Sequence, residues 1–147
     1  MNDDYRQLSK ALAIMTGAFE FKEDKGGFPY SLHCLAVMEG VRHLGPIAMT
    51  IAVLHDLLED CPEWTVDRLR EEGFSREVYN SVDQLTRIPG ENYEDYIKSL
   101  SMNPVLRAIK MADLRHNMNP SRLKGLTKKD FDRMKKYQKA YVYLSSV

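Results

Sequence analysis

Cysteine, tryptophan and long apolar runs are all scarce in this sequence of 147 residues. Its two cysteines, Cys34 and Cys61, provide neither a disulfide framework nor a cysteine-based zinc motif, so we expect two free thiols in a reducing cytoplasm. No stretch approaches the roughly 18 apolar residues that a membrane span needs. The first residues are acidic and lack the basic and apolar segments of a signal peptide.

The formal net charge is zero, because 21 Lys and Arg residues balance 21 Asp and Glu residues. This balance argues against a nucleic-acid polymer as the partner. The charges are unevenly spread, however, since eight basic residues lie between Arg122 and Lys139 against only Asp130 and Asp132. This basic run is either a solvated helix face or a phosphate-binding surface, and the sequence leaves both open.

Helical periodicity runs through the whole chain, which we expect to form one all-α domain of residues 1–147. No segment alternates polar and apolar residues with the period of a strand. Prolines, glycines and capping residues divide the chain, and Thr127 with Asp130 resembles a capping box. The predicted helices cover residues 3–20, 31–43, 46–60, 65–73, 75–86, 93–100, 104–118 and 127–144.

His55 and Asp56 lie inside the apolar run Ile51-Ala-Val-Leu-His-Asp-Leu-Leu58. A carboxylate buried in an apolar helix is costly unless it is compensated, and a metal ion compensates a His-Asp pair well. Glu59 and Asp60 follow one turn later, so on a continuous helix all four side chains would project from one side. His33 and Asp113 are the other candidate ligands, since each also lies among apolar residues.

Two imidazoles and two carboxylates suit a divalent ion such as Mn²⁺ or Fe²⁺, and Zn²⁺ or Mg²⁺ remain possible. Each residue also has a structural explanation. His33 alone would fit an ordinary core histidine, Asp113 a buried salt bridge with Lys110, and Glu59-Asp60 a solvated helix end. We interpret the two remaining histidines, His43 and His116, as structural.

Four ordered motifs resemble those of the HD-domain metal-dependent phosphohydrolases, and more closely the hydrolase domain of RelA/SpoT homologues. His55-Asp-Leu-Leu-Glu-Asp60 has their HDxxED form, and Gly27-Phe-Pro-Tyr-Ser-Leu-His33 resembles their G-x-P-Y-x-x-H segment. Lys110-Met-Ala-Asp-Leu-Arg-His-Asn117 is similar to their K-L-A-D-x-x-H-N segment. Leu85-Thr86-Arg87 resembles the family's L/V-x-T-K/R stretch, which lies between the HDxxED and K-L-A-D-x-x-H-N segments. The resemblance covers roughly residues 8–123.

This resemblance implies a single HD-domain bundle of about six to eight helices. The ligands of one metal, usually Mn²⁺, would be His33, His55, Asp56 and Asp113. Glu59 and Asp60 would orient or deprotonate a metal-bound water. The implied reaction is hydrolysis of the 3′-pyrophosphate of the guanosine alarmones ppGpp and pppGpp, small nucleotides, by a stand-alone hydrolase. The residues expected to contact substrate are Lys22, Lys25, Lys110 and Asn117.

Departures from the family pattern gather at positions that would contact substrate. Asp24 stands where the family has an arginine, Phe19 where it has a histidine, Leu114 where it has an arginine, and Pro120 where it has a threonine. These changes leave open an HD phosphohydrolase that acts on another nucleotide, such as a nucleoside monophosphate or NADP(H). A non-catalytic module that binds a nucleotide or a protein partner is a third hypothesis.

Overall fold

The computed structural model describes all 147 residues and is helical throughout, which confirms the predicted all-α class. Besides two short 3₁₀ helices, η1 (Arg42–Leu44) and η2 (Pro120–Arg122), it contains eight helices longer than one turn and the single turn α4, so the expected number of helices is confirmed. The α-helices are α1 (Asp3–Ala18), α2 (Ser31–Gly40), α3 (Pro46–Val53), α4 (Leu57–Asp60), α5 (Val66–Glu71), α6 (Arg76–Leu85), α7 (Tyr93–Ser101), α8 (Pro104–Asn117) and α9 (Lys128–Ser146).

Capping residues set most helix starts where the sequence predicts them. The side chains of Thr65 and Ser75 each accept a hydrogen bond from a backbone N–H in the first turn of the helix that follows. Thr127 and Asp130 form the complete capping box of α9. Because these local signals specify where a helix begins, the starts of α5, α6 and α9 follow from the sequence.

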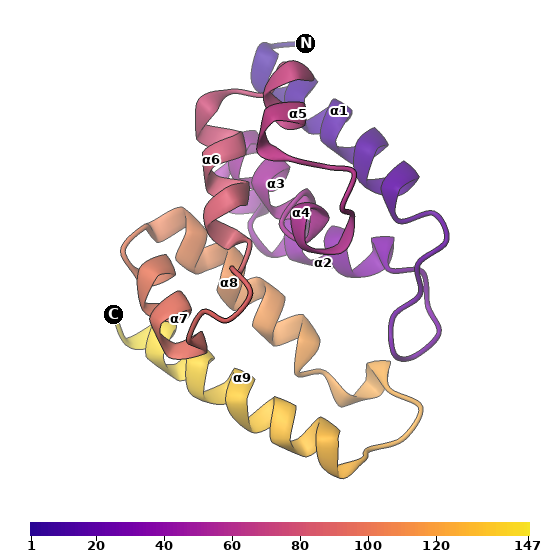
Figure 1. Ribbon diagram of the computed structural model, residues 1–147, viewed down its shortest axis with the longest axis vertical. Coiled ribbons are helices and arrows are strands. Elements are labelled where there is room, and N and C mark those ends of the chain that lie inside the picture. Colours follow the sequence, from indigo (N-terminus) through magenta and orange to yellow (C-terminus); the bar gives the residue numbers. More distant parts are fainter.

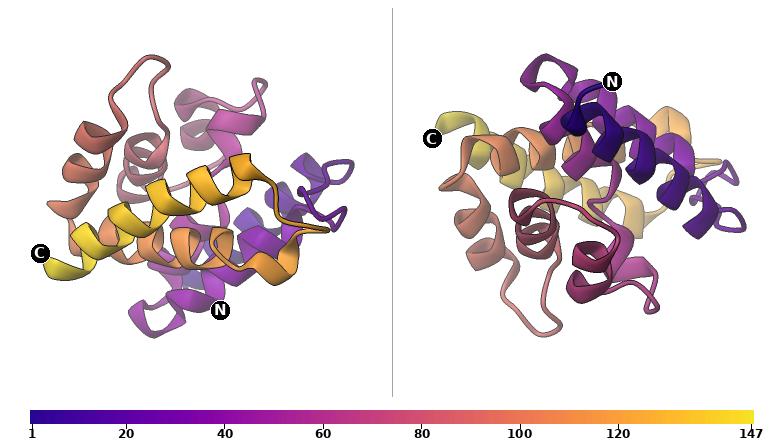
Figure 2. Two further views of the ribbon diagram at one scale, coloured as in Figure 1. Left: turned by 90° about the horizontal axis from the view of Figure 1, so that it is seen from below. Right: turned by 90° about the horizontal axis from the view of Figure 1, so that it is seen from above.

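The central helix of the bundle is α3, which packs against α1, α2, α6 and α8. Residues 48–53 of α3 are all buried, as expected for a helix that is surrounded on every side. The helix α8 lies between this part of the molecule and α9, and α7 packs on both α8 and α9 (Figures 1 and 2). Neighbouring elements therefore converge on α3 and α8, and the candidate ligands lie on α2, in the turn after α3 and on α8.

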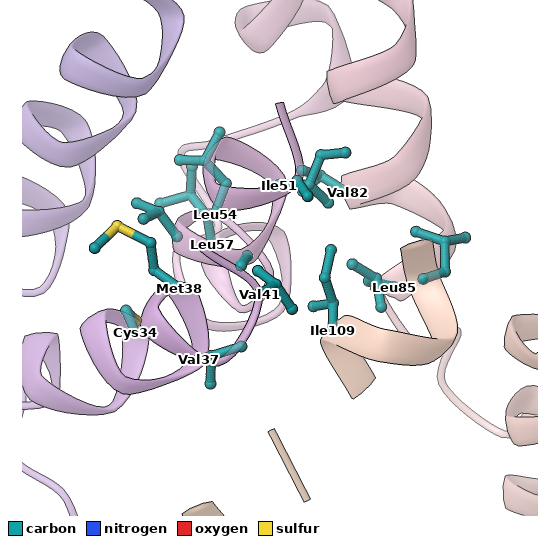
Figure 3. Packing of buried hydrophobic residues seen from close by; sticks show 14 of the residues in the cluster. Cys34, Val37, Met38, Val41, Ile51, Leu54, Leu57, Val82, Leu85 and Ile109 are labelled. Atoms are coloured by element: carbon teal, nitrogen blue, oxygen red, sulfur yellow. The ribbon is translucent and has the colours of Figure 1, made fainter. Parts of the chain in front are cut away.

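The hydrophobic core joins α2, α3, α6 and α8. Val37, Ile51, Val82 and Ile109 come from these four helices and lie together in one cluster (Figure 3). Full burial of such a side chain contributes about 1.5–3 kcal/mol. A Cβ built on Gly40 would lie 2.8 Å from Cβ of Ala112, so glycine lets α2 approach α8 closely. This close approach brings His33 on α2 toward Asp113 on α8.

The expectation of one continuous helix from Pro46 to Asp60 is wrong. The helix stops at Val53, and a tight turn of Leu54, His55 and Asp56 precedes α4. The N–H groups of His55 and Leu57 bond carbonyls three residues back, at Ala52 and Leu54, instead of four. No proline or glycine marks this turn in the sequence. The turn changes the directions of His55 and Asp56, so they no longer share one helix face with Glu59 and Asp60.

Both cysteines are buried free thiols, as expected. Among the helices of the structure, none combines the length and the apolar character required to cross a membrane.

Candidate metal centre

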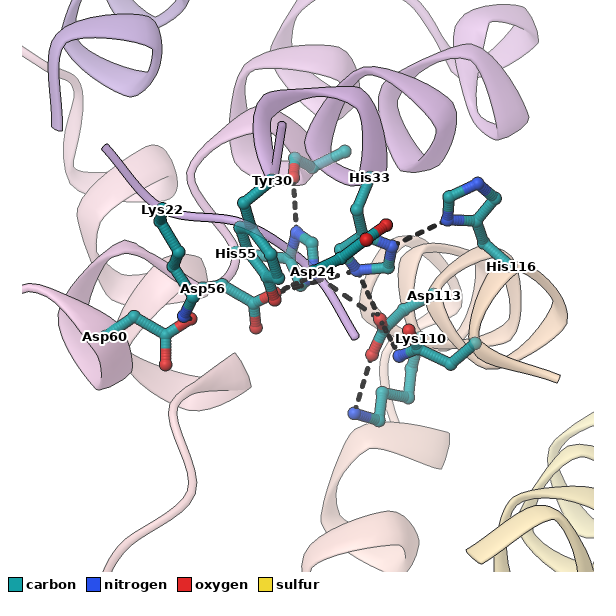
Figure 4. A network of polar contacts seen from close by, with 12 residues as sticks. Lys22, Asp24, Tyr30, His33, His55, Asp56, Asp60, Lys110, Asp113 and His116 are labelled. Atoms are coloured by element: carbon teal, nitrogen blue, oxygen red, sulfur yellow. Dashed lines mark hydrogen bonds and ion pairs between the residues drawn. The ribbon is translucent and has the colours of Figure 1, made fainter. Parts of the chain in front are cut away.

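Four candidate ligands converge at one point, where three of them are fully buried and Asp56 is mostly buried. One ligand atom from each of His33, His55, Asp56 and Asp113 lies within 4.8 Å of those of the other three. Nε2 of His55 is 3.0 Å from Oδ2 of Asp56, and Nε2 of His33 is 3.0 Å from Oδ1 of Asp113 (Figure 4). They come from α2, from the turn after α3 and from α8, and they form the mixed nitrogen and oxygen set expected from the sequence.

The orientation of His55 fits metal coordination. Its Nδ1 lies 2.7 Å from the carbonyl oxygen of Ala52, and this carbonyl accepts the Nδ1–H. Nε2 therefore faces the carboxylates, where it is buried without a hydrogen-bond partner. Burial alone would lower the pKa of His55, but the nearby charges of Asp56 and Asp113 raise it well above its ordinary value. Both properties indicate a position that favours a cation.

His33 is oriented by His116, a residue that the sequence analysis interpreted as structural. Nδ1 of His33 lies 2.8 Å from Nδ1 of His116, and the two rings stack with centroids 5.0 Å apart. Burial, with the nearby charge of Arg122, lowers the pKa of His116 to about 4. Neutral His116 accepts the Nδ1–H of His33 when its own Nδ1 is unprotonated, and Nε2 of His33 is then free to bind a metal.

Each of the two carboxylates accepts a hydrogen bond from a donor outside the cluster. Lys110 Nζ lies 2.9 Å from Oδ2 of Asp113, and Asn117 Nδ2 donates to Oδ1 at 2.8 Å. Burial alone would raise the pKa of Asp113, but Lys110 and the two histidines hold it well below its usual range. The Tyr30 hydroxyl donates to Oδ2 of Asp56 at 2.5 Å. The salt bridge of Asp113 with Lys110 and its place in the cluster coexist, because they use different oxygens.

Glu59 and Asp60 lie beside the centre and point to different neighbours. Oε1 of Glu59 accepts a hydrogen bond of 2.6 Å from the backbone N–H of Arg87. Burial, aided by the charges of Asp56 and Asp60, raises the pKa of Glu59 despite that bond. Asp60 instead pairs with Lys22, whose Nζ lies 2.7 Å from its Oδ2. The raised pKa of Glu59 is the direction expected of a proton acceptor.

A basic pocket of about 310 Å³ adjoins the metal centre. Lys22, Lys25 and Asn117, three of the four predicted substrate contacts, line it. Tyr30 and Asn117 connect this pocket to the cluster, because they donate hydrogen bonds to Asp56 and Asp113. The fourth predicted contact, Lys110, is not among the lining residues and lies mostly buried between Asp113 and the ring of Tyr96.

Arg122, Arg133 and Tyr137 also line the pocket, and the sequence analysis did not single them out. Arg122 and Arg133 belong to the basic run between residues 122 and 139. That run provided a signal, but its interpretation as a solvated helix face or a phosphate surface stayed open. The structure turns Arg122 and Arg133 toward the lysines of the 22–30 turn, while Lys128, Lys129 and Lys135 remain exposed.

Asp24, which stands where the family has an arginine, is engaged within the protein. Its Oδ1 accepts hydrogen bonds from the backbone N–H groups of Gly26 and Phe28, both at 2.9 Å. Its Oδ2 lies 3.2 Å from Nη2 of Arg122. These donors offset the effect of burial and lower the pKa of Asp24. The negative charge at position 24 is therefore neutralised by a guanidinium that also lines the pocket.

Comparison with known proteins finds relatives whose names describe enzymes of guanosine nucleotides. No family model matches the chain. A probable GTP pyrophosphokinase of Mycobacterium leprae is 33% identical over 129 residues, which cover 76% of this chain. The guanosine-3′,5′-bis(diphosphate) 3′-pyrophosphohydrolase of Haemophilus influenzae is 31% identical over 118 residues and 71% of this chain. The chain is therefore related to one segment of these RelA/SpoT-family proteins.

The RelA/SpoT relatives are much longer proteins. The chain spans 16% of the Mycobacterium leprae protein, 15% of a GTP pyrophosphokinase of Streptomyces antibioticus that is 30% identical to it, and 17% of the Haemophilus influenzae protein. Their names describe enzymes that act on nucleotides, with opposite reactions. Because the names of the relatives differ, a reaction for this chain has to be argued from the site.

Proposed function

We propose that this chain is a single HD-type domain, residues 1–147, that hydrolyses the 3′-pyrophosphate of ppGpp and pppGpp with one divalent ion, Mn²⁺ in our assignment. The observation that carries the proposal is the cluster of His33, His55, Asp56 and Asp113 beside a basic pocket. The similarity to a guanosine-3′,5′-bis(diphosphate) 3′-pyrophosphohydrolase supports the same reaction.

The four clustered side chains would hold the ion through two imidazole nitrogens and two carboxylate oxygens. Such an ion supplies Lewis acidity, which lowers the pKa of water and offsets negative charge on phosphate oxygens. Tyr30 and Asn117 would keep the two carboxylates in place through their hydrogen bonds. His116 and the Ala52 carbonyl would do the same for the two imidazoles.

In the reaction, the oxygen of a water would form a bond to the phosphorus attached to the ribose 3′ oxygen. The bond between that phosphorus and the 3′ oxygen breaks, so pyrophosphate leaves and the 3′ oxygen takes up a proton. Glu59 would accept the proton of the water, in keeping with its raised pKa. Lys22, Lys25 and Arg133 would pair with phosphate oxygens in the pocket. Hydrolysis then proceeds without a second nucleotide.

A second candidate is an HD phosphohydrolase that acts on another nucleotide. The observation that favours it is the set of family departures at Asp24, Leu114 and Pro120, positions where the resemblance implies substrate contacts. A nucleoside monophosphate or NADP(H) would use the same metal cluster and release phosphate instead of pyrophosphate.

The test is a substrate panel with Mn²⁺ present, in which pyrophosphate and phosphate are measured separately. The panel contains ppGpp, pppGpp, nucleoside monophosphates and NADP(H), and an Asp56→Ala protein serves as the control for contaminating activity. We expect pyrophosphate release from the two alarmones to exceed all other turnover. Phosphate release from another nucleotide alone would favour the second candidate, and no turnover on any substrate would reject both.

A further inference from the structure

Arg122 is held in place by three groups that belong to different parts of the molecule. Its Nη1 donates to the backbone carbonyl of His116 at 3.0 Å and to Oδ1 of Asn117 at 3.2 Å. Its Nη2 pairs with Oδ2 of Asp24 at 3.2 Å, a contact that joins residues 98 positions apart. The Arg122 side chain is only 18% exposed, so this network is partly shielded from water.

The contact with Arg122 decides which way the Asn117 amide faces. A guanidinium has only N–H donors, so it selects the carbonyl oxygen of the Asn117 side chain. The amide Nδ2 is thereby turned to the opposite side, where it donates to Oδ1 of Asp113 at 2.8 Å. That oxygen is the one nearest to His33 Nε2. Arg122 therefore acts on a candidate metal ligand through one intermediate residue.

The same side chain holds the turn that carries the pocket lysines. The 22–30 turn is closed by backbone hydrogen bonds, from Asp24 N–H to Phe28 O at 2.8 Å and from Tyr30 N–H to Lys22 O at 2.9 Å. Gly26 in this turn packs against the backbone of Arg122, and a Cβ built on Gly26 would overlap the Arg122 carbonyl oxygen. The turn and the segment that follows α8 lie side by side in both views of Figure 2.

We propose that Arg122 is a positioning residue that couples the metal centre to the substrate pocket. Through Asn117 it fixes the orientation of Asp113, and through Asp24 it fixes the turn that presents Lys22 and Lys25. The inference rests on the proposed function of the site. It assigns a role to Arg122, which the sequence motifs do not predict. A single guanidinium then serves the metal side and the phosphate side at once.

The metal side is tested by a double-mutant cycle on Mn²⁺ affinity, measured by titration calorimetry of the whole chain. Arg122→Ala should weaken Mn²⁺ binding on the order of threefold to tenfold, below the range of about 10–100-fold for groups that bond a ligand directly. In an Asn117→Ala background the same change should have almost no further effect, because Arg122 acts through Asn117. Equal effects of Arg122→Ala in both backgrounds would overturn this part.

The pocket side is tested by steady-state kinetics with ppGpp. Arg122→Ala should raise KM by roughly tenfold, because the released turn no longer holds Lys25 in place. Arg122→Lys should restore much of KM but not the Mn²⁺ affinity, since one ammonium can pair with Asp24 but lacks the planar set of donors for Asn117. Recovery of both KM and Mn²⁺ affinity in Arg122→Lys would show that only the positive charge matters, and would reject the positioning role.

Lys128→Ala is the matched control, because it removes one positive charge from the same basic run at an exposed position away from the 22–30 turn. It should leave Mn²⁺ affinity and KM unchanged, and an effect as large as that of Arg122→Ala would reject the proposal. If Arg122→Ala fails to fold by circular dichroism, Arg122→Gln replaces it.

A wild type without ppGpp turnover would reject the proposed function while the calorimetric cycle still tests Arg122. Normal turnover with wild-type Mn²⁺ affinity and KM in Arg122→Ala would reject Arg122 alone.

Discussion

The metal centre and the adjacent pocket are built in different ways. The centre is buried among helices, and its ligands come from α2, the turn after α3 and α8, within motifs that are contiguous in sequence. The pocket lies where the 22–30 turn, the segment after α8 and the first half of α9 meet. Core packing fixes the first region, whereas long-range polar contacts such as Asp24 with Arg122 fix the second. The cluster of candidate ligands is therefore the part of the site that is more predictable from the sequence.

The strongest test of this contrast removes a ligand from the centre. His55→Ala or Asp56→Ala should abolish Mn²⁺ binding and all turnover, because no other side chain in the cluster can replace the lost donor atom. Calorimetry for the metal and pyrophosphate release for the reaction provide the two measurements. Metal-dependent turnover that survives in either variant would contradict the assignment of ligands.

Glu59→Gln should separate metal binding from catalysis. The amide keeps an oxygen for the N–H of Arg87 but cannot accept a proton, so turnover should fall on the order of 100-fold or more while Mn²⁺ affinity stays unchanged. Single-turnover kinetics with ppGpp at saturating Mn²⁺ measure this effect. A Glu59→Gln protein with normal turnover would assign the proton transfer to another group.

His116→Ala should weaken the centre without removing a ligand. Loss of the partner of His33 Nδ1 frees the ring to rotate, and we expect Mn²⁺ affinity to fall by about tenfold. Titration of the metal checks this, with His43→Ala as the control because His43 is exposed in η1. Equal affinities of the His116 and His43 variants would show that the contact does not orient His33.

An effect of similar size, but on KM alone, is expected in the pocket. Lys25→Ala should raise KM for ppGpp by roughly tenfold, the effect of one lost charge-assisted hydrogen bond at a partly exposed site, and should leave Mn²⁺ affinity unchanged. Measured KM and calorimetric affinity separate the two regions. A Lys25→Ala protein that loses metal binding would contradict the division between centre and pocket.

The sequence predicts the helices well where local chemistry decides them. The caps at Thr65, Ser75 and Thr127 and the prolines at the starts of α3 and α8 mark boundaries that the structure contains. The turn at residues 54–56 escapes prediction because it contains no helix-breaking residue. Its short-range hydrogen bonds form within a buried core, and periodicity along a single chain does not report them.

Contacts between distant segments mark the limit of sequence reasoning about the site. The convergence of His33, His55, Asp56 and Asp113 agrees with the ordered motifs, although their role as ligands stays a prediction. The pairing of His33 with His116 depends on how closely α2 approaches α8, which Gly40 permits. In the sequence alone, Asp24 is an acid at a position expected to contact substrate. Its pairing with Arg122, 98 positions later, becomes evident only in the structure.

Diffraction from crystals soaked in Mn²⁺, recorded where manganese scatters anomalously, tests the central claim most directly. We expect one anomalous peak within coordination distance of Nε2 of His33, Nε2 of His55, a carboxylate oxygen of Asp56 and Oδ1 of Asp113. The matched Asp56→Ala crystal should lack this peak. A peak elsewhere, or none among these four side chains in the wild type, would contradict the assignment of a metal centre.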